Sequence, residues 1–502
     1  MKDNKKGLHP VWFFSILIVI TIGLSFILSL NNIQGTEYSI SQTGKVTSKI
    51  ITVNSMFGRT GLSFIFGDGI NNLAKFTPFG AIIIGLIGVG ALIKTGLLKE
   101  IFSRLSKKIP RRVMFFLFSL LCIVMGFSQD LSFVIMIPIS IPLFTEYKRS
   151  QVTGMTLAFV SVAAGANINL FITSLDYSLI EIAKNTVKSI DSDYSYGYSG
   201  NLFFIVIASL LLALLISIIT EFVSRNKPVR IAEEENEISE KVKNKALRKT
   251  SLVFIVISII FVYSILPGLP FSGALLDNEQ LLYVNKLFGA NSPFVNGILY
   301  IVAFISLICG IVYGISTKQI KSEIDIVKLL TSNLNNIGEL LLILFFASEF
   351  VSIFKYSNIG EVITSRLFDF IYAGEFSFIV LIAFSILAII ISGLFMSSVA
   401  TKWQMFVPCL LPLFMKSNIT PEFTGAIFRL ASSIPNMISP VFPYFALYAG
   451  FMALYSKNDF RMRKCYGTLM PYFIGITILF IFIIFGWYIL GAPIGSNIYP
   501  TI

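Results

Sequence analysis

The chain has 502 residues, of which 55% are hydrophobic and 13% are charged, about half the charged share of a typical soluble domain. So little charge cannot cover a water-facing surface, which excludes a soluble enzyme, a nucleic-acid-binding protein and a disordered chain. The net charge of +12, from 39 Lys and Arg against 27 Asp and Glu, is explained by basic cytoplasmic loops of a membrane protein. The composition therefore predicts an all-α polytopic membrane protein with no nucleic-acid partner.

Histidine and cysteine usage limits the available chemistry. The only histidine is His9, in the N-terminal tail, so a His-based metal centre or catalytic triad is excluded. The four cysteines have no zinc or redox spacing, and neither a disulfide framework nor a metal site is expected. No Walker-type phosphate loop occurs, so we expect no bound cofactor and no ATP-driven process.

Long apolar stretches follow one another almost to the end of the chain. About 20 residues cross the hydrocarbon core as a helix, and the backbone must satisfy its own polar groups in lipid, which favours helices here. The first stretch, Val11 to Leu30, is long enough to span, so no cleaved signal is expected. The predicted spans are residues 11–30, 79–98, 202–220, 251–265, 297–315, 338–354, 376–396 and 467–490.

Two regions, 113–176 and 397–455, are less regular, because Pro, Gly, Ser and Asn interrupt their apolar pieces. Such pieces are typical of re-entrant hairpins or discontinuous helices. FSQDLSFVIMIPISIPLF at 127–144 and SSVATKWQMFVPCLLPLF at 397–414 share the spacing of their prolines and a closing Leu-Phe pair. We therefore predict one membrane domain, residues 1–502, with repeats at about 72–176 and 337–455 joined through the charged stretch 225–250.

The loops predict the orientation of the spans. Basic residues collect on the cytoplasmic side, which places the N-terminal MKDNKK and residues 99–112, 225–249 and 457–464 there. Segments 31–77, 174–200 and 266–296 are then external. The spans that precede the two repeat copies run in opposite directions, so the repeats are predicted to be inverted. Inverted repeats with interrupted helices are typical of secondary transporters, whose substrate site lies near the midplane.

Two acids lie beside the interruptions, and charged groups within membrane segments are usually functional. Asp176 follows GANINLFITSL, and its carboxylate could bind a coupling cation or a proton. The alternative is a solvated acid at the membrane surface. Asp130 in the first repeat copy is a second candidate, and its counterpart in the second copy is Ala400.

Arg429 and Trp403 are candidates for contacting a substrate. The planar fork of Arg429, in GAIFRLASSIPNMISP, suits a carboxylate; the alternative is a structural partner for a helix end or for an acid such as Glu422. Trp403, in ATKWQMF, could stack on an aromatic substrate. It could equally be an interfacial tryptophan beside a snorkelling Lys402.

Three asparagines lie within the two interruptions: Asn167 and Asn169 in the first and Asn436 in the second. Their amides, together with freed backbone carbonyls, could hold Na⁺ or substrate oxygens. The alternative is hydrogen bonding between helices.

At these residues the sequence resembles the AbgT family, the p-aminobenzoyl-glutamate transporters, over nearly its whole length. The segments that carry the resemblance are NLAKFTPFGAIIIGLIGVGALIKTGLL (72–98), GANINLFITSLD (165–176), FFASEFVSIFKYSNIG (345–360), SSVATKWQMFVPCLLPLF (397–414), FRLASSIPNMISPVFPYFAL (428–447) and GAPIG (491–495).

The resemblance implies about nine transmembrane helices and two helical hairpins in inverted repeats, assembled as a homodimer in the cytoplasmic membrane. It implies transport of p-aminobenzoyl-glutamate, a small anionic aromatic substrate, or export of sulfonamide antimetabolites, coupled to Na⁺ or H⁺.

The family's functional positions that are retained are Asp176, Trp403, Arg429, Pro421 and Pro440. Three positions depart: the acid expected one turn after the arginine is Ser432, the asparagine expected before the tryptophan is Gly393, and a small polar residue is replaced by Ala400.

For the implied substrate we expect Arg429 to pair with a carboxylate, Trp403 to stack on the ring, and Asn167 and Asn436 to bond the remaining oxygens. Asp176 would bind the coupling cation, and Ser432 in place of an acid would leave Arg429 freer for an anion. Other readings are a carrier for another carboxylate on the same fold and a passive channel. An intramembrane enzyme is disfavoured because no predicted span contains His.

Overall fold

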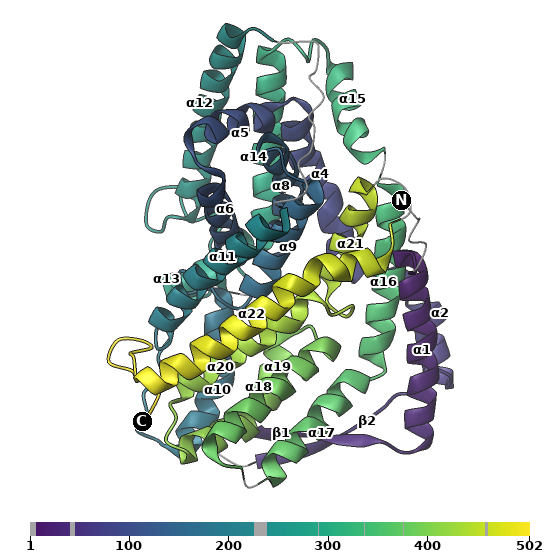
Figure 1. Cartoon of the computed structure of the whole chain (residues 1–502), viewed down its shortest axis with the longest axis vertical. Coiled ribbons are helices and arrows are strands. Elements are labelled where there is room, and N and C mark those ends of the chain that lie inside the picture. The colour runs from purple at the N-terminus through teal and green to yellow at the C-terminus, as the bar shows by residue number, and fades with distance from the viewer. Residues whose placement is uncertain are drawn as a thin grey trace.

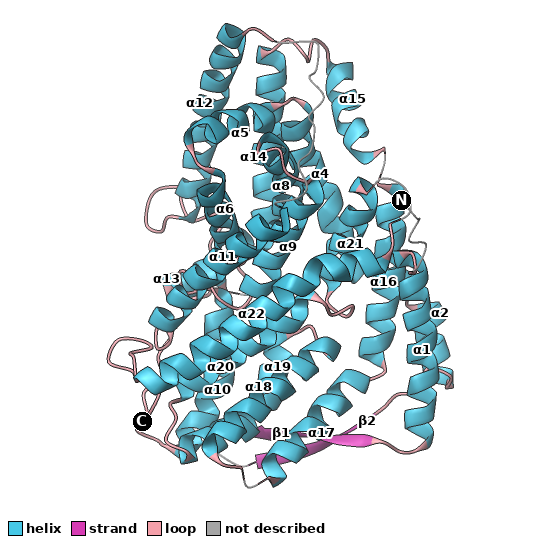
Figure 2. Cartoon of the chain, in the orientation of Figure 1, coloured by secondary structure: helices cyan, strands magenta, loops and turns pink. Residues whose placement is uncertain are grey.

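The computed structural model describes residues 7–40, 46–224, 238–289, 291–335, 337–374, 376–456 and 460–502. The N-terminal MKDNKK, residues 225–237 of the charged stretch and residues 457–459 of the last basic loop, all predicted to be cytoplasmic, lie outside the described residues. The structure is nearly all helical (Figures 1 and 2).

Each of the eight predicted spans is a helix. Six helices are long and apolar enough to cross a membrane, or seven if α15 (Glu323–Leu334) and α16 count as one bent span; these numbers refer to the described ranges. The prediction of nine spans stays a prediction. The eight helices are α1 (Pro10–Leu30), α4 (Thr77–Lys94), α11 (Leu202–Ser224), α12 (Glu240–Ile265), α14 (Pro293–Ser316), α16 (Gly338–Tyr356), α18 (Phe378–Phe395) and α22 (Met462–Leu490).

Small residues allow α4 and α14 to pack closely. A Cβ added at Gly88 would lie 2.5 Å from the Cα of Ala303, and one at Gly310 would lie 2.9 Å from the Cβ of Ala91. Membrane helices gain no hydrophobic energy by leaving lipid, so such close backbone approach is a main source of their association.

The first irregular region is a chain of short helices, as predicted. After α5 (Leu97–Lys108), no helix up to α9 exceeds 15 residues, fewer than a straight span needs. These elements are α6 (Arg111–Met125), α7 (Gln129–Leu131), a π-helical turn at Ser132–Met136, α8 (Ile137–Glu146) and α9 (Gln151–Gly165), and the longer α10 (Ser174–Ile190) follows them. Residues 166–173 between α9 and α10 form the first break.

The second irregular region is also a series of helices with a break. It consists of α19 (Val399–Lys416), α20 (Pro421–Ser433), a 3₁₀ turn at Ile434–Met437 and α21 (Pro443–Tyr455). The second break, residues 434–442, thus follows α20 as the first break follows α9. The inverted relation of the two copies, at about 72–176 and 337–455, stays a prediction.

A β-hairpin makes the all-α prediction wrong at one place. Strands β1 (Gln34–Ile40) and β2 (Val46–Thr52) pair antiparallel at one end of the molecule, beside α17 (Ile359–Ala373) (Figures 1 and 2). Ser365 of α17 binds this hairpin, because its Oγ donates to the carbonyl oxygen of Thr36 at 2.8 Å. The β-branched residues of VTSKIIT favour a strand, a signal that hydropathy alone passes over.

Three short helices complete the chain. They are α2 (Arg59–Gly67), α3 (Gly69–Lys75) and α13 (Tyr283–Phe288), and all three lie in segments predicted to be external.

Candidate functional site

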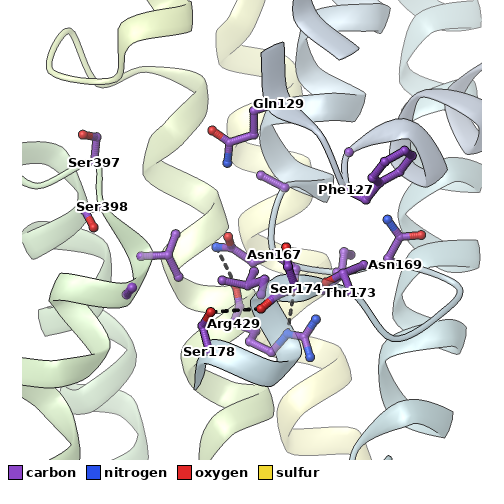
Figure 3. A pocket seen from close by; sticks show the side chains of 16 residues that line it. Phe127, Gln129, Asn167, Asn169, Thr173, Ser174, Ser178, Ser397, Ser398 and Arg429 are labelled. Carbon is purple, nitrogen blue, oxygen red and sulfur yellow. Dashed lines mark hydrogen bonds between the residues drawn. The ribbon is translucent and has the colours of Figure 1, made fainter. Parts of the chain in front are cut away.

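A cavity of about 350 Å³ lies where the two irregular regions meet. Figure 3 shows Ser397 and Ser398 on one side, Phe127 and Thr173 on the other, and Arg429 between them. Its walls come from residues 126–129, from the first break and the start of α10, from residues 397–400, and from Arg429 of α20. The volume falls within the range of small-molecule sites, about 300–1,000 Å³.

Asn169 holds the first break against the end of α6. Its Nδ2 donates to the carbonyl oxygen of Val124 at 3.0 Å and to that of Ile123 at 3.3 Å. Its Oδ1 accepts from the N–H of Leu170 at 2.8 Å. Asn169 thus bonds two carbonyls of the last turn of α6, where backbone donors within the helix run short, and both its amide nitrogen and its amide oxygen have partners within the protein.

Asp176 begins α10 as part of a capping box. The backbone N–H and the Oγ1 of Thr173 both donate to Asp176 Oδ2 at 2.7 Å. A carboxylate in the first turn also interacts favourably with the helix dipole. The interpretation of Asp176 as a solvated surface acid is wrong, because its side chain is only 7% exposed.

Arg429 is the ion-pair partner of Asp176. Its Nη1 donates to Asp176 Oδ1, and both side chains are buried. Its Nε donates to the backbone carbonyl of Asn167 at 2.6 Å. The acid beside Arg429 is therefore Asp176 and not Glu422, and Arg429 is not as free as the change to Ser432 suggested.

Hydrogen bonds link each break to the helix that precedes the other break. Asn167 Nδ2 donates to Ser432 Oγ at 2.8 Å, so Ser432 contacts the first break from the place where the family pattern has an acid. Asn436 Nδ2 donates to the carbonyl of Ala163, at the end of α9, at 3.3 Å. These bonds hold the two interrupted segments against each other.

Two amide oxygens in this network lack a protein partner. Asn167 Oδ1 and Asn436 Oδ1 are buried and accept no hydrogen bond from any residue that the structure describes. Buried acceptors are normally satisfied. Asn167 also lines the cavity, so its free oxygen could accept from a substrate or coordinate Na⁺. Within the described ranges no group of three acidic, His or Cys side chains could hold a metal ion.

Trp403 does not line the cavity. The side chains of Trp403 and Lys402 are fully buried, so the interpretation as an interfacial tryptophan beside a snorkelling lysine is wrong. The indole N–H donates to the carbonyl of Leu179 in α10 at 2.8 Å, and the ring packs on Phe428 at 4.6 Å between centroids. In this conformation the ring joins α10, α19 and α20 and has no face toward the cavity.

Asp130 and the two prolines also lie outside the cavity lining. Asp130 accepts from the hydroxyl of Tyr444 and so links α7 to α21. Pro421 is buried in the first turn of α20, where its missing N–H costs nothing. Pro440 lies in the second break.

The ring of Pro435 occupies the space that a larger residue at Gly393 would need. A Cβ at Gly393 would lie 2.2 Å from Pro435 Cγ. The asparagine of the family pattern therefore does not fit here without a shift of the second break.

Several polar residues of the cavity have no motif in the sequence that marks them, namely Gln129, Ser174, Ser178, Ser397 and Ser398. Their only signal is position, because Gln129 begins α7, the next two lie at the start of α10 after the first break, and the last two precede α19. The sequence also contains no sign of a bond between Glu422 and the loop after α10, where the Tyr194 hydroxyl donates to Glu422 Oε2 at 2.7 Å. Burial, followed by the nearby Glu422 carboxylate, raises the pKa of Tyr194 well above its usual value.

Comparisons with known proteins identify the family of this chain and several similar proteins. The model of the AbgT putative transporter family matches residues 4–502. The p-aminobenzoyl-glutamate transport protein of Escherichia coli (strain K12) is 25% identical over 506 residues, which cover 99% of this chain and 96% of that protein.

Two solved structures are also similar. The YdaH transporter of Alcanivorax borkumensis is 23% identical with a TM-score of 0.49, covering 97% of this chain and 100% of that one. MtrF of Neisseria gonorrhoeae, described with a class of antimetabolite efflux pumps, is 26% identical with a TM-score of 0.49, covering 98% and 97%.

Proposed function

The chain belongs to the AbgT family of transporters, and from this premise we propose that it is an ion-gradient-driven secondary transporter of p-aminobenzoyl-glutamate or a similar aromatic-acid conjugate. It is a multi-pass membrane protein of a transporter family and not an enzyme. The observation that carries the proposal is the pairing, in one cavity between two broken helices, of a buried arginine with an amide oxygen that lacks a partner.

The substrate carboxylate binds Arg429 in this proposal. A guanidinium has five N–H donors; the Nε of Arg429 donates to Asn167 and one Nη1 hydrogen to Asp176, which leaves others for a ligand. Asn167 Oδ1 accepts from the amide N–H or amine of the substrate. Phe127 lines the cavity and supplies the aromatic wall that Trp403 does not.

The coupling ion binds at Asp176. When the substrate carboxylate binds the remaining donors of Arg429, two carboxylates share one guanidinium, so the positive charge no longer balances Asp176 fully. An uncompensated buried carboxylate is costly, so Asp176 then takes up H⁺ or Na⁺. Asn169 and Asp130 have protein partners and are weaker candidates for this role.

Uptake into proteoliposomes tests the proposal. Radiolabelled p-aminobenzoyl-glutamate should accumulate above its external concentration when a pH or Na⁺ gradient is imposed. Arg429→Gln should weaken substrate binding at least about tenfold, because a charge-assisted hydrogen bond contributes about 1.5–3 kcal/mol. Arg366→Gln, which removes an exposed arginine of α17, is the matched control and should transport normally.

Other results would redirect the proposal. A passive channel would equilibrate the substrate without accumulation. Equal accumulation by wild type and Arg429→Gln would show that Arg429 does not bind the substrate. A sulfonamide has an aromatic amine but no carboxylate, so transport of a sulfonamide that is unaffected by Arg429→Gln would favour antimetabolite efflux.

The homodimer and the cytoplasmic N-terminus belong to the same proposal. In the most apolar stretch of α12 only 11% is buried inside the structure, and in that of α1 only 17%. These two helices therefore offer faces to lipid or to a second copy. Cross-linking of single-cysteine variants in native membranes would identify the face in contact. A strictly monomeric protein after mild solubilisation would contradict the dimer.

A further inference from the structure

A second and larger cavity, of about 900 Å³, lies between α6, α11 and Arg149 in the turn before α9, apart from the site described above. Helix α6 packs beside α11 (Figure 1). The polar part of its lining is three arginines, Arg111, Arg112 and Arg149, and one acid, Glu221. The cavity therefore carries an excess of two positive charges.

Glu221 neutralises only one of these arginines. It pairs with Arg111 through two bonds, of which Nε to Oε2 measures 2.9 Å. Arg112 and Arg149 form no ion pair with any acid in the ranges that the structure describes. The Nε of Arg149 is buried and has no hydrogen-bond partner among these residues. A buried guanidinium nitrogen without a partner indicates a site for an anion.

The rest of the cavity wall is apolar and faces outward. Leu214, Ile218 and Phe222 follow one another at intervals of four along α11, and they are 47%, 57% and 78% exposed. Residues four apart share one face of a helix, so the three form a continuous apolar stripe. This stripe leads away from the arginines along the length of a membrane-spanning helix.

An anionic phospholipid matches both parts of this surface. Its headgroup phosphate suits the arginine pair, and its acyl chain suits the apolar stripe. Basic pockets between transmembrane helices bind such headgroups. A free phosphate ion would bind the arginines but would make no contact with the apolar stripe. A second copy of the chain, docked on this face about a two-fold axis, would bring arginine against arginine.

We propose that this cavity binds one anionic phospholipid of the surrounding bilayer, with its phosphate on Arg112 and Arg149 and an acyl chain along α11. The site is independent of the transported substrate. The lipid would fasten the start of α6 to the end of α11, next to the Arg111–Glu221 pair that already joins them.

Native mass spectrometry of the full-length protein tests this. Delipidated protein is titrated with phosphatidylglycerol, with zwitterionic phosphatidylcholine and with inorganic phosphate. One phosphatidylglycerol should bind in preference to phosphatidylcholine. The double variant Arg112→Gln/Arg149→Gln should lose about 25-fold in phosphatidylglycerol affinity, because each basic side chain beside an anionic lipid contributes about a fivefold factor.

The matched control is Lys107→Gln/Lys108→Gln, which removes two exposed basic residues of the neighbouring α5 without touching the cavity. It should bind phosphatidylglycerol as wild type does. An equal loss in the control, equal binding of the two lipids, or displacement of phosphatidylglycerol by inorganic phosphate would each overturn the proposal. If the double Gln variant does not fold, the wild-type lipid preference and the Ile218→Asn variant decide, since Ile218→Asn should weaken lipid binding while every charge is kept.

Discussion

Breaking the buried Asp176–Arg429 pair should destabilise the protein more than any single surface change. The two side chains are 7% and 3% exposed, so removal of one leaves the other charge without compensation, at a cost of about 3–5 kcal/mol. The cost of Asp176→Asn should lie at the upper end of this range, because the buried arginine then faces a neutral amide. The cost of Arg429→Gln should lie at the lower end, since Thr173 and the start of α10 still stabilise the Asp176 carboxylate.

The double variant Asp176→Asn/Arg429→Gln removes both charges and leaves no unpaired ion. Its loss in the free energy of unfolding should be smaller than the sum of the single losses by at least about 2 kcal/mol. Reversible unfolding of all four proteins in one detergent, followed by tryptophan fluorescence and circular dichroism, measures this difference. Losses that add to within about 0.5 kcal/mol would refute the reasoning, because independent sites behave in that way.

Three further changes have defined outcomes. Trp403→Phe loses the indole hydrogen bond to α10 and should cost about 1 kcal/mol, while substrate affinity should stay unchanged; a large fall in affinity would restore a substrate-stacking role. Lys402→Met should raise the thermal midpoint, because Lys402 Nζ is buried without a partner in the part of the chain that the structure describes; a lower midpoint would reveal a partner. Gly88→Leu should separate α4 from α14 at Ala303 and cost about 1–3 kcal/mol or more. Gly80→Ala of the same helix, which has open space around it, should not lower the thermal midpoint in the same assay and should raise it slightly, because Ala favours a helix over Gly.

Much of the fold could be predicted from hydropathy and helix breakers. The apolar stretches become helices because backbone groups must be satisfied in lipid. The breaks at 166–173 and 434–442 follow from Gly, Asn and Pro within apolar sequence. The β-hairpin was not predicted, because its strands lie in a polar segment without the long apolar stretch that marks a span. Strand propensity is weak evidence by itself.

The candidate site was harder to predict, since its geometry depends on contacts distant in sequence. Asp176 and Arg429 are 253 positions apart, and neither flanking sequence indicates the other. Trp403 follows Lys402 beside a break, which suggests exposure to a cavity or an interface. Only the packing of α19 against α10 decides that both are buried. Periodicity places a residue on a helix face, but it does not say which neighbour that face meets.

The hydrogen bonds that cross between the breaks have a consequence for movement. The Asn167 side chain donates to Ser432, and the Asn167 backbone carbonyl accepts from Arg429. The Asn436 side chain donates to a carbonyl at the end of α9. Neither break can change its backbone path without releasing a bond to the helix that leads into the other break. We therefore expect the two broken segments to move together, so that a ligand that displaces one also frees the other.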